Sequence, residues 1–127
     1  MNKEEITNFE KVHAQLRGFY DDITVLVKKD PKEEMNRFKL KLVNKVLSKA
    51  NEIIGDIKPF EDFDEFDIDG DMPNKSDVAM ILGQYINSMD VLKKDNVHVY
   101  SGKWYWKVSG DSNNTELHTS APADLKK

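Results

Sequence analysis

In the stretch Val97-His-Val-Tyr-Ser-Gly-Lys-Trp-Tyr-Trp-Lys-Val108, apolar and polar residues alternate with a period of two. Before it, up to Leu92, apolar residues recur at steps of three and four. A period of two is typical of strands, and steps of three and four are typical of amphipathic helices. The sequence therefore predicts a helical chain that ends in a β-hairpin.

The hairpin has a predicted register. A two-residue loop at Ser101-Gly102 pairs Val97 with Trp106 and Val99 with Trp104, all on one face. We expect this face to pack on the helices, because an isolated hairpin is marginal in water. The opposite, exposed face is then formed by Tyr100, His98, Tyr105, Lys103 and Lys107.

Three helices are predicted upstream of the hairpin, over residues 3–29, 31–54 and 76–94. Asp30-Pro31 marks the break between the first two, with Asp30 as N-cap and Pro31 as the first helical residue of the second. The first helix presents Ile6, Phe9, Val12, Leu16, Phe19, Tyr20, Ile23 and Leu26 or Val27 on its apolar stripe. The second presents Met35, Phe38, Leu42, Val43, Val46, Ala50, Ile53 and Ile54. For the third, either Asn74 with Asp77 or Ser76 is the expected cap.

The connection between the second and third helices is acidic. Residues 56–77 carry two basic and nine acidic side chains, whereas the whole chain has a net charge of −4. Pro59, Gly70 and Pro73 prevent a long regular element here. Three phenylalanines at steps of three are expected to face the core from one or two helical turns: Phe60, Phe63 and Phe66.

The predicted fold class is mainly α: an antiparallel three-helix bundle with a long acidic crossover and a small C-terminal β-hairpin. Residues 1–108 form a single helical domain with the hairpin at its end. Residues 109–127 are polar and are expected to form a flexible tail.

Composition excludes several classes of protein. The chain has no cysteine, which excludes disulfide scaffolds, thiolate zinc sites and cysteine nucleophiles. Its N-terminus lacks the pattern of a secretory signal, and no apolar run reaches the roughly 20 residues of a membrane span. We therefore expect a cytoplasmic protein that does not enter a membrane.

No metal or cofactor is expected. Glu65, Asp67, Asp69 and Gly70 match the first half of an EF-hand loop, but Ser76 occupies the position that needs a bidentate glutamate. His13, His98 and His118 lack metal-ligand spacing. A solvated acidic loop is the simpler interpretation.

The leading hypothesis is a non-enzymatic protein-interaction module, such as a small accessory or regulatory protein. Exposed aromatic side chains are common interface anchors, an open strand edge invites pairing, and a dense acidic patch suits a basic partner. The partner is another protein or a second copy of this chain. The candidate partner-binding residues are Tyr100, Trp104, Tyr105 and Trp106 in the hairpin, and Glu61, Asp62, Asp64 and Glu65 in the acidic connection. The alternative is that the rings only close the core and the carboxylates form a solvated face.

Two further hypotheses remain open. A basic ridge on the second helix could contact phosphates of a nucleic acid, although the acidic composition argues against this; it consists of Arg37, Lys41, Lys45 and Lys49. A helical hydrolase or nuclease could gather its site from distant helices, but no catalytic motif identifies such residues. Arg17 and Asp21 have the spacing of a helical ion pair.

Overall fold

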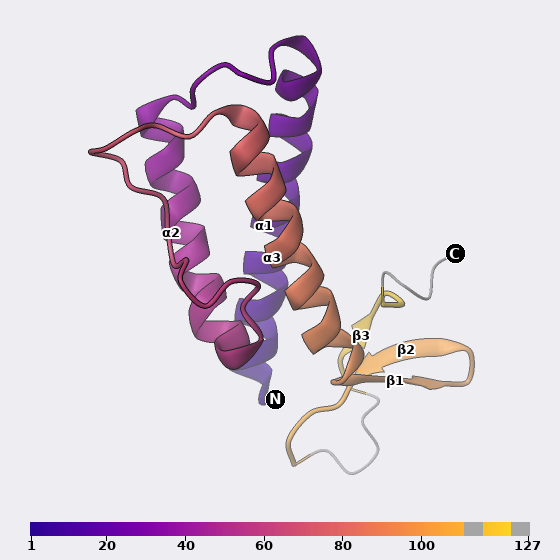
Figure 1. Cartoon of the computed structure of the whole chain (residues 1–127). Coiled ribbons are helices and arrows are strands. Elements are labelled where there is room, and N and C mark those ends of the chain that lie inside the picture. The colour runs from indigo at the N-terminus through magenta and orange to yellow at the C-terminus, as the bar shows by residue number, and fades with distance from the viewer. Residues whose placement is uncertain (111–115, 123–127) are drawn as a thin grey trace.

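The computed structural model describes residues 1–110 and 116–122. Three α-helices and one short 3₁₀ helix precede a three-stranded antiparallel sheet (Figure 1). The helices are α1 (Lys3–Lys29), α2 (Arg37–Ile54), η1 (Gly55–Ile57) and α3 (Lys75–Lys94). The strands are β1 (Val97–Tyr100), β2 (Lys103–Trp106) and β3 (His118–Thr119). The prediction of a mainly helical chain is thus confirmed, and the predicted hairpin forms two strands of a three-stranded sheet.

Side-chain caps define the starts of α1 and α3. Asn2 and Glu5 form a capping box at α1, and Asn74 and Asp77 form the same arrangement at α3. In each, the asparagine oxygen accepts from a backbone N–H that has no partner within the helix. Of the two predicted caps for the third helix, Asn74 is the one used.

The predicted start of the second helix at Pro31 is wrong. Asp30 caps the C-terminus of α1, and α2 begins at Arg37, six residues after the predicted start, with Asn36 as its N-cap. The segment between them lies beside the residues that precede α3: the Met35 N–H donates to the Pro73 carbonyl over 3.0 Å, and a bridge joins Glu34 to Asn74. These long-range hydrogen bonds pair backbone N–H and carbonyl groups that would have been paired within the chain segment if it had formed a helical turn.

The core lies where α1 contacts both α2 and α3, and the helices bury one stripe each. Two residues of the predicted second stripe are exposed instead: Phe38 at 69% and Leu42 at 36%. Leu40 and Leu47, which the prediction omitted, are fully buried. Because α2 begins only at Arg37, Phe38 lies in the first turn of α2 and at the edge of the contact between α1 and α2.

The acidic connection is anchored to the helices by asparagine side chains. The Asn44 amide both donates to the Phe66 carbonyl and accepts from the Phe66 N–H. Asn51 donates to the carbonyl of Asp64 and accepts from the Tyr85 hydroxyl over 2.7 Å. Burial raises the pKa of that hydroxyl.

Two of the three phenylalanines in this connection pack inward. The rings of Phe63 and Phe66 meet edge to face with centroids 5.0 Å apart, and both pack against the core. Phe60 is 39% exposed, which corrects the prediction that all three rings face the core. The chain forms turns after η1 rather than continuous helix, so side chains spaced three residues apart do not all point to the same face.

The predicted hairpin register is confirmed: Val97 pairs with Trp106 and Val99 with Trp104. Ser101 and Gly102 both have positive φ, at 51° and 77°, as a type I′ turn requires. Val97 and Trp106 pack on the helices, as expected, and Trp104 is partly buried against them. Val99 on the same face is 52% exposed, which corrects the prediction that the whole face packs on the helices.

The structure adds a third strand that the sequence did not predict. β3 pairs with β2, and the Trp106 N–H donates to the Leu117 carbonyl over 2.9 Å. Pro122 is fully buried. The prediction of a tail without structure is therefore wrong for residues 116–122, because the edge of β2 offers backbone partners there. Residues 111–115 and 123–127 lie outside the described residues.

No α-helix among the described residues has the length and apolar character needed to cross a bilayer.

Candidate functional site

The hairpin separates its four predicted partner-binding aromatics into different environments. Trp106 is fully buried: its ring meets Phe9 edge to face at 5.2 Å, and its Nε1–H donates to Glu10 Oε1 over 2.7 Å. Trp104 and Tyr105 are half-buried, whereas Tyr100 is 59% exposed. Trp106 thus belongs to the core, and Tyr100 lies at the surface beside the turn.

β1 is one of the two edge strands of the sheet. The strand order is β1-β2-β3, so β2 is paired on both sides, and no other strand among residues 1–110 and 116–122 pairs with the outer edge of β1. Edge strands are usually protected by lysine, proline or a bulge. β1 reads Val-His-Val-Tyr and contains neither lysine nor proline, and Val99 is 52% exposed.

The four predicted acidic residues are exposed. Glu61, Asp62, Asp64 and Glu65 all lie in the turns after η1. Asp64 forms an ion pair of 2.6 Å with Lys58 of the same connection. Figure 1 shows that this connection runs along α2, while the hairpin extends away beyond the end of α3. The two predicted binding elements are therefore on separate parts of the molecule.

The basic ridge is divided and partly neutralised. Arg37 forms an ion pair of 2.6 Å with Asp69. Lys41 and Lys45 line a shallow pocket that also contains the carboxylates of Glu65, Asp67 and Asp69. Lys49 lines a different pocket, with Lys11 and Glu52. The acidic connection thus lowers the positive potential that this ridge offers to a phosphate.

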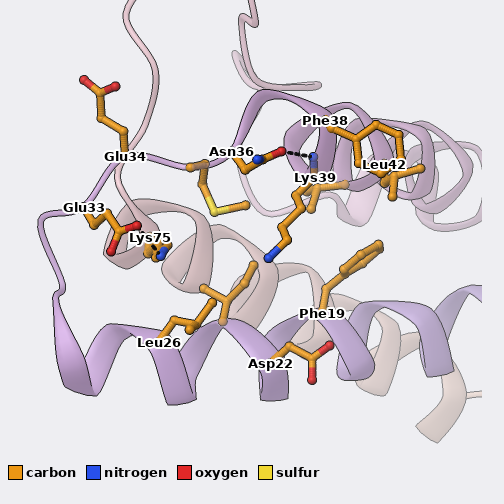
Figure 2. A pocket seen from close by; sticks show the side chains of 13 residues that line it. Phe19, Asp22, Leu26, Glu33, Glu34, Asn36, Phe38, Lys39, Leu42 and Lys75 are labelled. Carbon is orange, nitrogen blue, oxygen red and sulfur yellow. Dashed lines mark hydrogen bonds and ion pairs between the residues drawn. The ribbon is translucent and has the colours of Figure 1, made fainter.

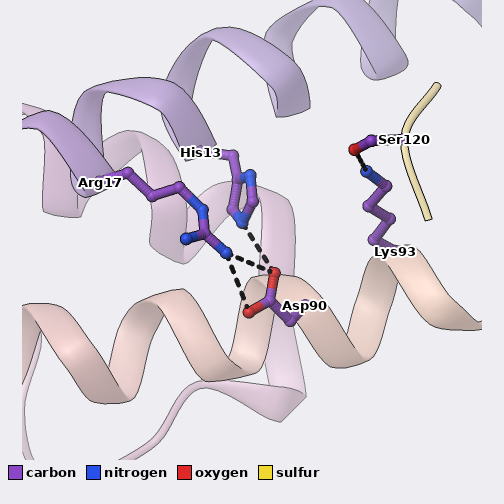
Figure 3. A network of polar contacts seen from close by, with 5 residues as sticks. All are labelled: His13, Arg17, Asp90, Lys93 and Ser120. Atoms are coloured by element: carbon purple, nitrogen blue, oxygen red, sulfur yellow. Dashed lines mark hydrogen bonds and ion pairs between the residues drawn. The ribbon is translucent and has the colours of Figure 1, made fainter. Parts of the chain in front are cut away.

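A polar cleft lies where α1, α3 and the sheet meet, and no pattern in the sequence indicated it. Its volume is about 370 Å³. His13 Nε2 donates to Asp90 Oδ1 over 2.9 Å, and Arg17 Nη2 lies 3.5 Å from both Asp90 oxygens (Figure 3). Lys93 Nζ donates to Ser120 Oγ over 3.1 Å. The prediction that Arg17 pairs with Asp21 is replaced by this contact between helices.

Asp90 is the electrostatic centre of the cleft. Burial alone would raise the pKa of its carboxyl, but the hydrogen bond from His13 and the charges of His13 and Arg17 outweigh burial and lower that pKa. Asp90 is therefore ionised near neutral pH and can only accept hydrogen bonds. His13 Nε2 must then carry a proton. His13 and Arg17 are 77 and 73 residues away from Asp90 in sequence, so the spacing of residues along the chain could not reveal the cluster.

A groove between α1 and α2 has a volume of about 590 Å³. Figure 2 shows Phe19 and Leu26 of α1 on one side, and Phe38 and Leu42 of α2 on the other. The side chain of Lys39 extends from α2 across the opening. The late start of α2 leaves this space, because residues 30–36 turn away from α1 toward the start of α3.

No group of three or more His, Asp or Glu side chains within the described ranges has an arrangement that could hold a metal ion. Comparisons of the chain with protein-family models, with curated proteins and with solved structures found no match.

Proposed function

We propose that this protein is a non-enzymatic interaction module that binds a partner protein by adding a strand to the outer edge of β1. The single observation that carries the proposal is that β1 is an edge strand without protecting charges and with an exposed apolar side chain at Val99. In strand addition, main-chain hydrogen bonds supply affinity and alternate side chains supply specificity. Val99 and Tyr100 are the side chains available for that contact.

The end of the hairpin that packs on the helices suits this role. Trp106 fixes β2 to α1, and β3 pairs with the other edge of β2. An incoming segment therefore joins a formed three-stranded sheet rather than an isolated hairpin. The binding edge is already ordered, so binding does not have to offset the entropy of ordering it. We take the helices to be an antiparallel three-helix bundle, with the acidic connection as its crossover, which serves as the support.

The acidic residues form a second element of the proposal. Glu61, Asp62 and Glu65 are exposed and would steer a basic partner surface toward the protein. A four-residue edge buries little area by itself, so the expected complex is transient. Binding should accordingly weaken as salt is raised.

The test compares two lysine substitutions at valines of equal exposure. Val99→Lys places a charge on the edge of β1, whereas Val91→Lys, at a valine that is 53% exposed on α3, is the matched control. Tagged proteins are purified from the native cell, and co-purifying proteins are quantified. We expect one or more proteins to be lost with Val99→Lys and retained with Val91→Lys.

The size of the purified protein identifies the partner further. A dimer that Val99→Lys dissociates and Val91→Lys does not would make the partner a second copy of this chain. Equal co-purification and an equal oligomeric state for both variants and the wild type would overturn strand addition at β1.

The polar cleft favours a second candidate function, hydrolysis. It contains an Asp–His pair and a Ser–Lys pair, and both kinds of pair activate hydroxyl nucleophiles in hydrolases. The test is turnover of p-nitrophenyl acetate and bis(p-nitrophenyl) phosphate by the wild type and by Ser120→Ala. Turnover that Ser120→Ala removes, with an unchanged circular dichroism spectrum, would support hydrolysis. Rates equal to buffer for both proteins would end it.

A further inference from the structure

We propose that the groove between α1 and α2 binds a small amphiphilic carboxylate, with its apolar chain along the groove and its carboxylate on Lys39. The groove is separate from β1 and its proposed partner. Its volume of about 590 Å³ lies within the roughly 300–1,000 Å³ typical of small-molecule sites.

The lining supports an apolar ligand body. Phe19 and Leu26 are half-buried at one wall, and Met35, which also lines the groove, is buried. On the other wall Phe38 is 69% exposed and Leu42 is 36% exposed. These two side chains were expected in the core from their helical period, and a ligand in the groove would remove them from water.

The groove lining includes three acidic residues and two lysines, and one of these lysines is available to a single anionic group. Lys39 reaches across the opening (Figure 2) and forms no ion pair with any carboxylate of the described residues. The other lysine at this site, Lys75, is already paired with Glu33 at 2.9 Å. In Figure 2 the carboxylate of Glu34 points away from the groove.

The single unpaired ammonium group, that of Lys39, matches a ligand with a single carboxylate. A phosphate monoester carries up to two negative charges, and its second charge would face Asp22 at the rim without compensation. The recognised chemistry is therefore an apolar chain with one carboxylate, as in a fatty acid.

The experiment titrates the full chain with dodecanoate, dodecanol and dodecyltrimethylammonium below their micelle concentrations. Binding is followed by calorimetry and by amide shifts in two-dimensional NMR. We expect dodecanoate to bind most tightly and to shift the amides of Phe19, Leu26 and Leu42. Lys39→Gln should weaken dodecanoate about fivefold, as for an exposed ion pair, and leave dodecanol unchanged. Lys32→Gln, at an exposed lysine that does not line the groove, should leave both unchanged.

A second pair of variants tests the apolar chain. Leu42→Asp should abolish dodecanoate binding, whereas Val25→Asp, at an exposed valine of α1 outside the groove lining, should not. Three results would each overturn the proposal: no groove shifts up to the solubility limit, equal effects of Lys39→Gln and Lys32→Gln, or tighter binding of the cationic amphiphile.

Discussion

The root and the tip of the hairpin carry similar side chains and have opposite exposures. The root is the pair Val97 and Trp106, which are 5% and 0% exposed. The tip is Val99 and Tyr100 with the turn that follows, and these two side chains are 52% and 59% exposed. Val97 and Val99 point to the same face of the same strand, two residues apart. Alternation therefore determines which face a side chain is on, but contact with the helices determines whether that side chain is covered.

The comparison also separates stability from binding. The root contacts α1 through Phe9 and Glu10, and so holds the sheet to the helices. The tip contacts little of the protein, so substitutions there should change binding without changing the fold. Each prediction below tests one side of this division.

The largest expected effect is at the root. Trp106→Ala removes a fully buried ring and the partner of Glu10, and should lower the free energy of unfolding by about 3–5 kcal/mol. Urea unfolding followed by far-ultraviolet circular dichroism measures this loss. Trp104→Ala, at the half-buried tryptophan of the same strand, is the control and should cost less than half as much. Equal losses would show that the root has no special role.

The second effect is at the polar contacts beside the root. Asp90→Asn removes the negative charge that holds His13 and Arg17, and should destabilise the protein by about 1–2 kcal/mol near neutral pH. The folded-state pKa of Asp90 is lowered, so the stability from its charge is present above its unfolded-state pKa. It is lost as the pH falls through the folded-state pKa. The difference between wild type and Asp90→Asn in urea unfolding should therefore shrink in acid, and a constant difference would contradict the assignment.

The third effect is at the turn of the tip. Ser101 has a φ of 51°, in the left-handed region that asparagine tolerates better than serine. Ser101→Asn should therefore raise the free energy of unfolding by about 0.5 kcal/mol. Ser109→Asn, at an exposed serine without positive φ, is the control and should have no effect. A loss of stability with Ser101→Asn would mean that the turn differs from type I′.

The smallest expected effect on stability is at the tip itself. Val99→Lys should change the free energy of unfolding by less than about 0.5 kcal/mol, because the side chain is already half in water. Thermal unfolding of the variant beside the wild type measures this. A loss above 1 kcal/mol would place Val99 among the structural residues and would remove the distinction between root and tip.

The sequence predicted the regular parts of the fold from local information. The three helices, the Asn74 cap as one of two candidates and the register of β1 with β2 all depend on residues close together in the chain, and the structure confirms them, although part of the stripe predicted for the second helix is exposed. The errors arose where distant segments compete for the backbone. Met35 bonds to Pro73 instead of lying within a helix that starts at Pro31, and Leu117 bonds to Trp106 instead of remaining in a tail.

The candidate sites show the same limit. Alternation alone placed Tyr100 and Trp106 on opposite faces of the hairpin, but it could not predict that Trp106 contacts Phe9 and Glu10, because these residues are nearly a hundred positions away in sequence. The cluster around Asp90 joins α1 to α3 and has no local pattern. Sites that combine single residues from distant helices require coordinates.

Site-specific photo-crosslinking tests the proposed role of the β1 edge most directly. A benzophenone amino acid replaces Val99 in one version of the protein and Val91 in another, and each is irradiated in the native cell. Strand addition predicts a discrete crosslinked product from position 99 and none of that mass from position 91. The same product from both positions, or products from position 91 alone, would contradict binding at this edge.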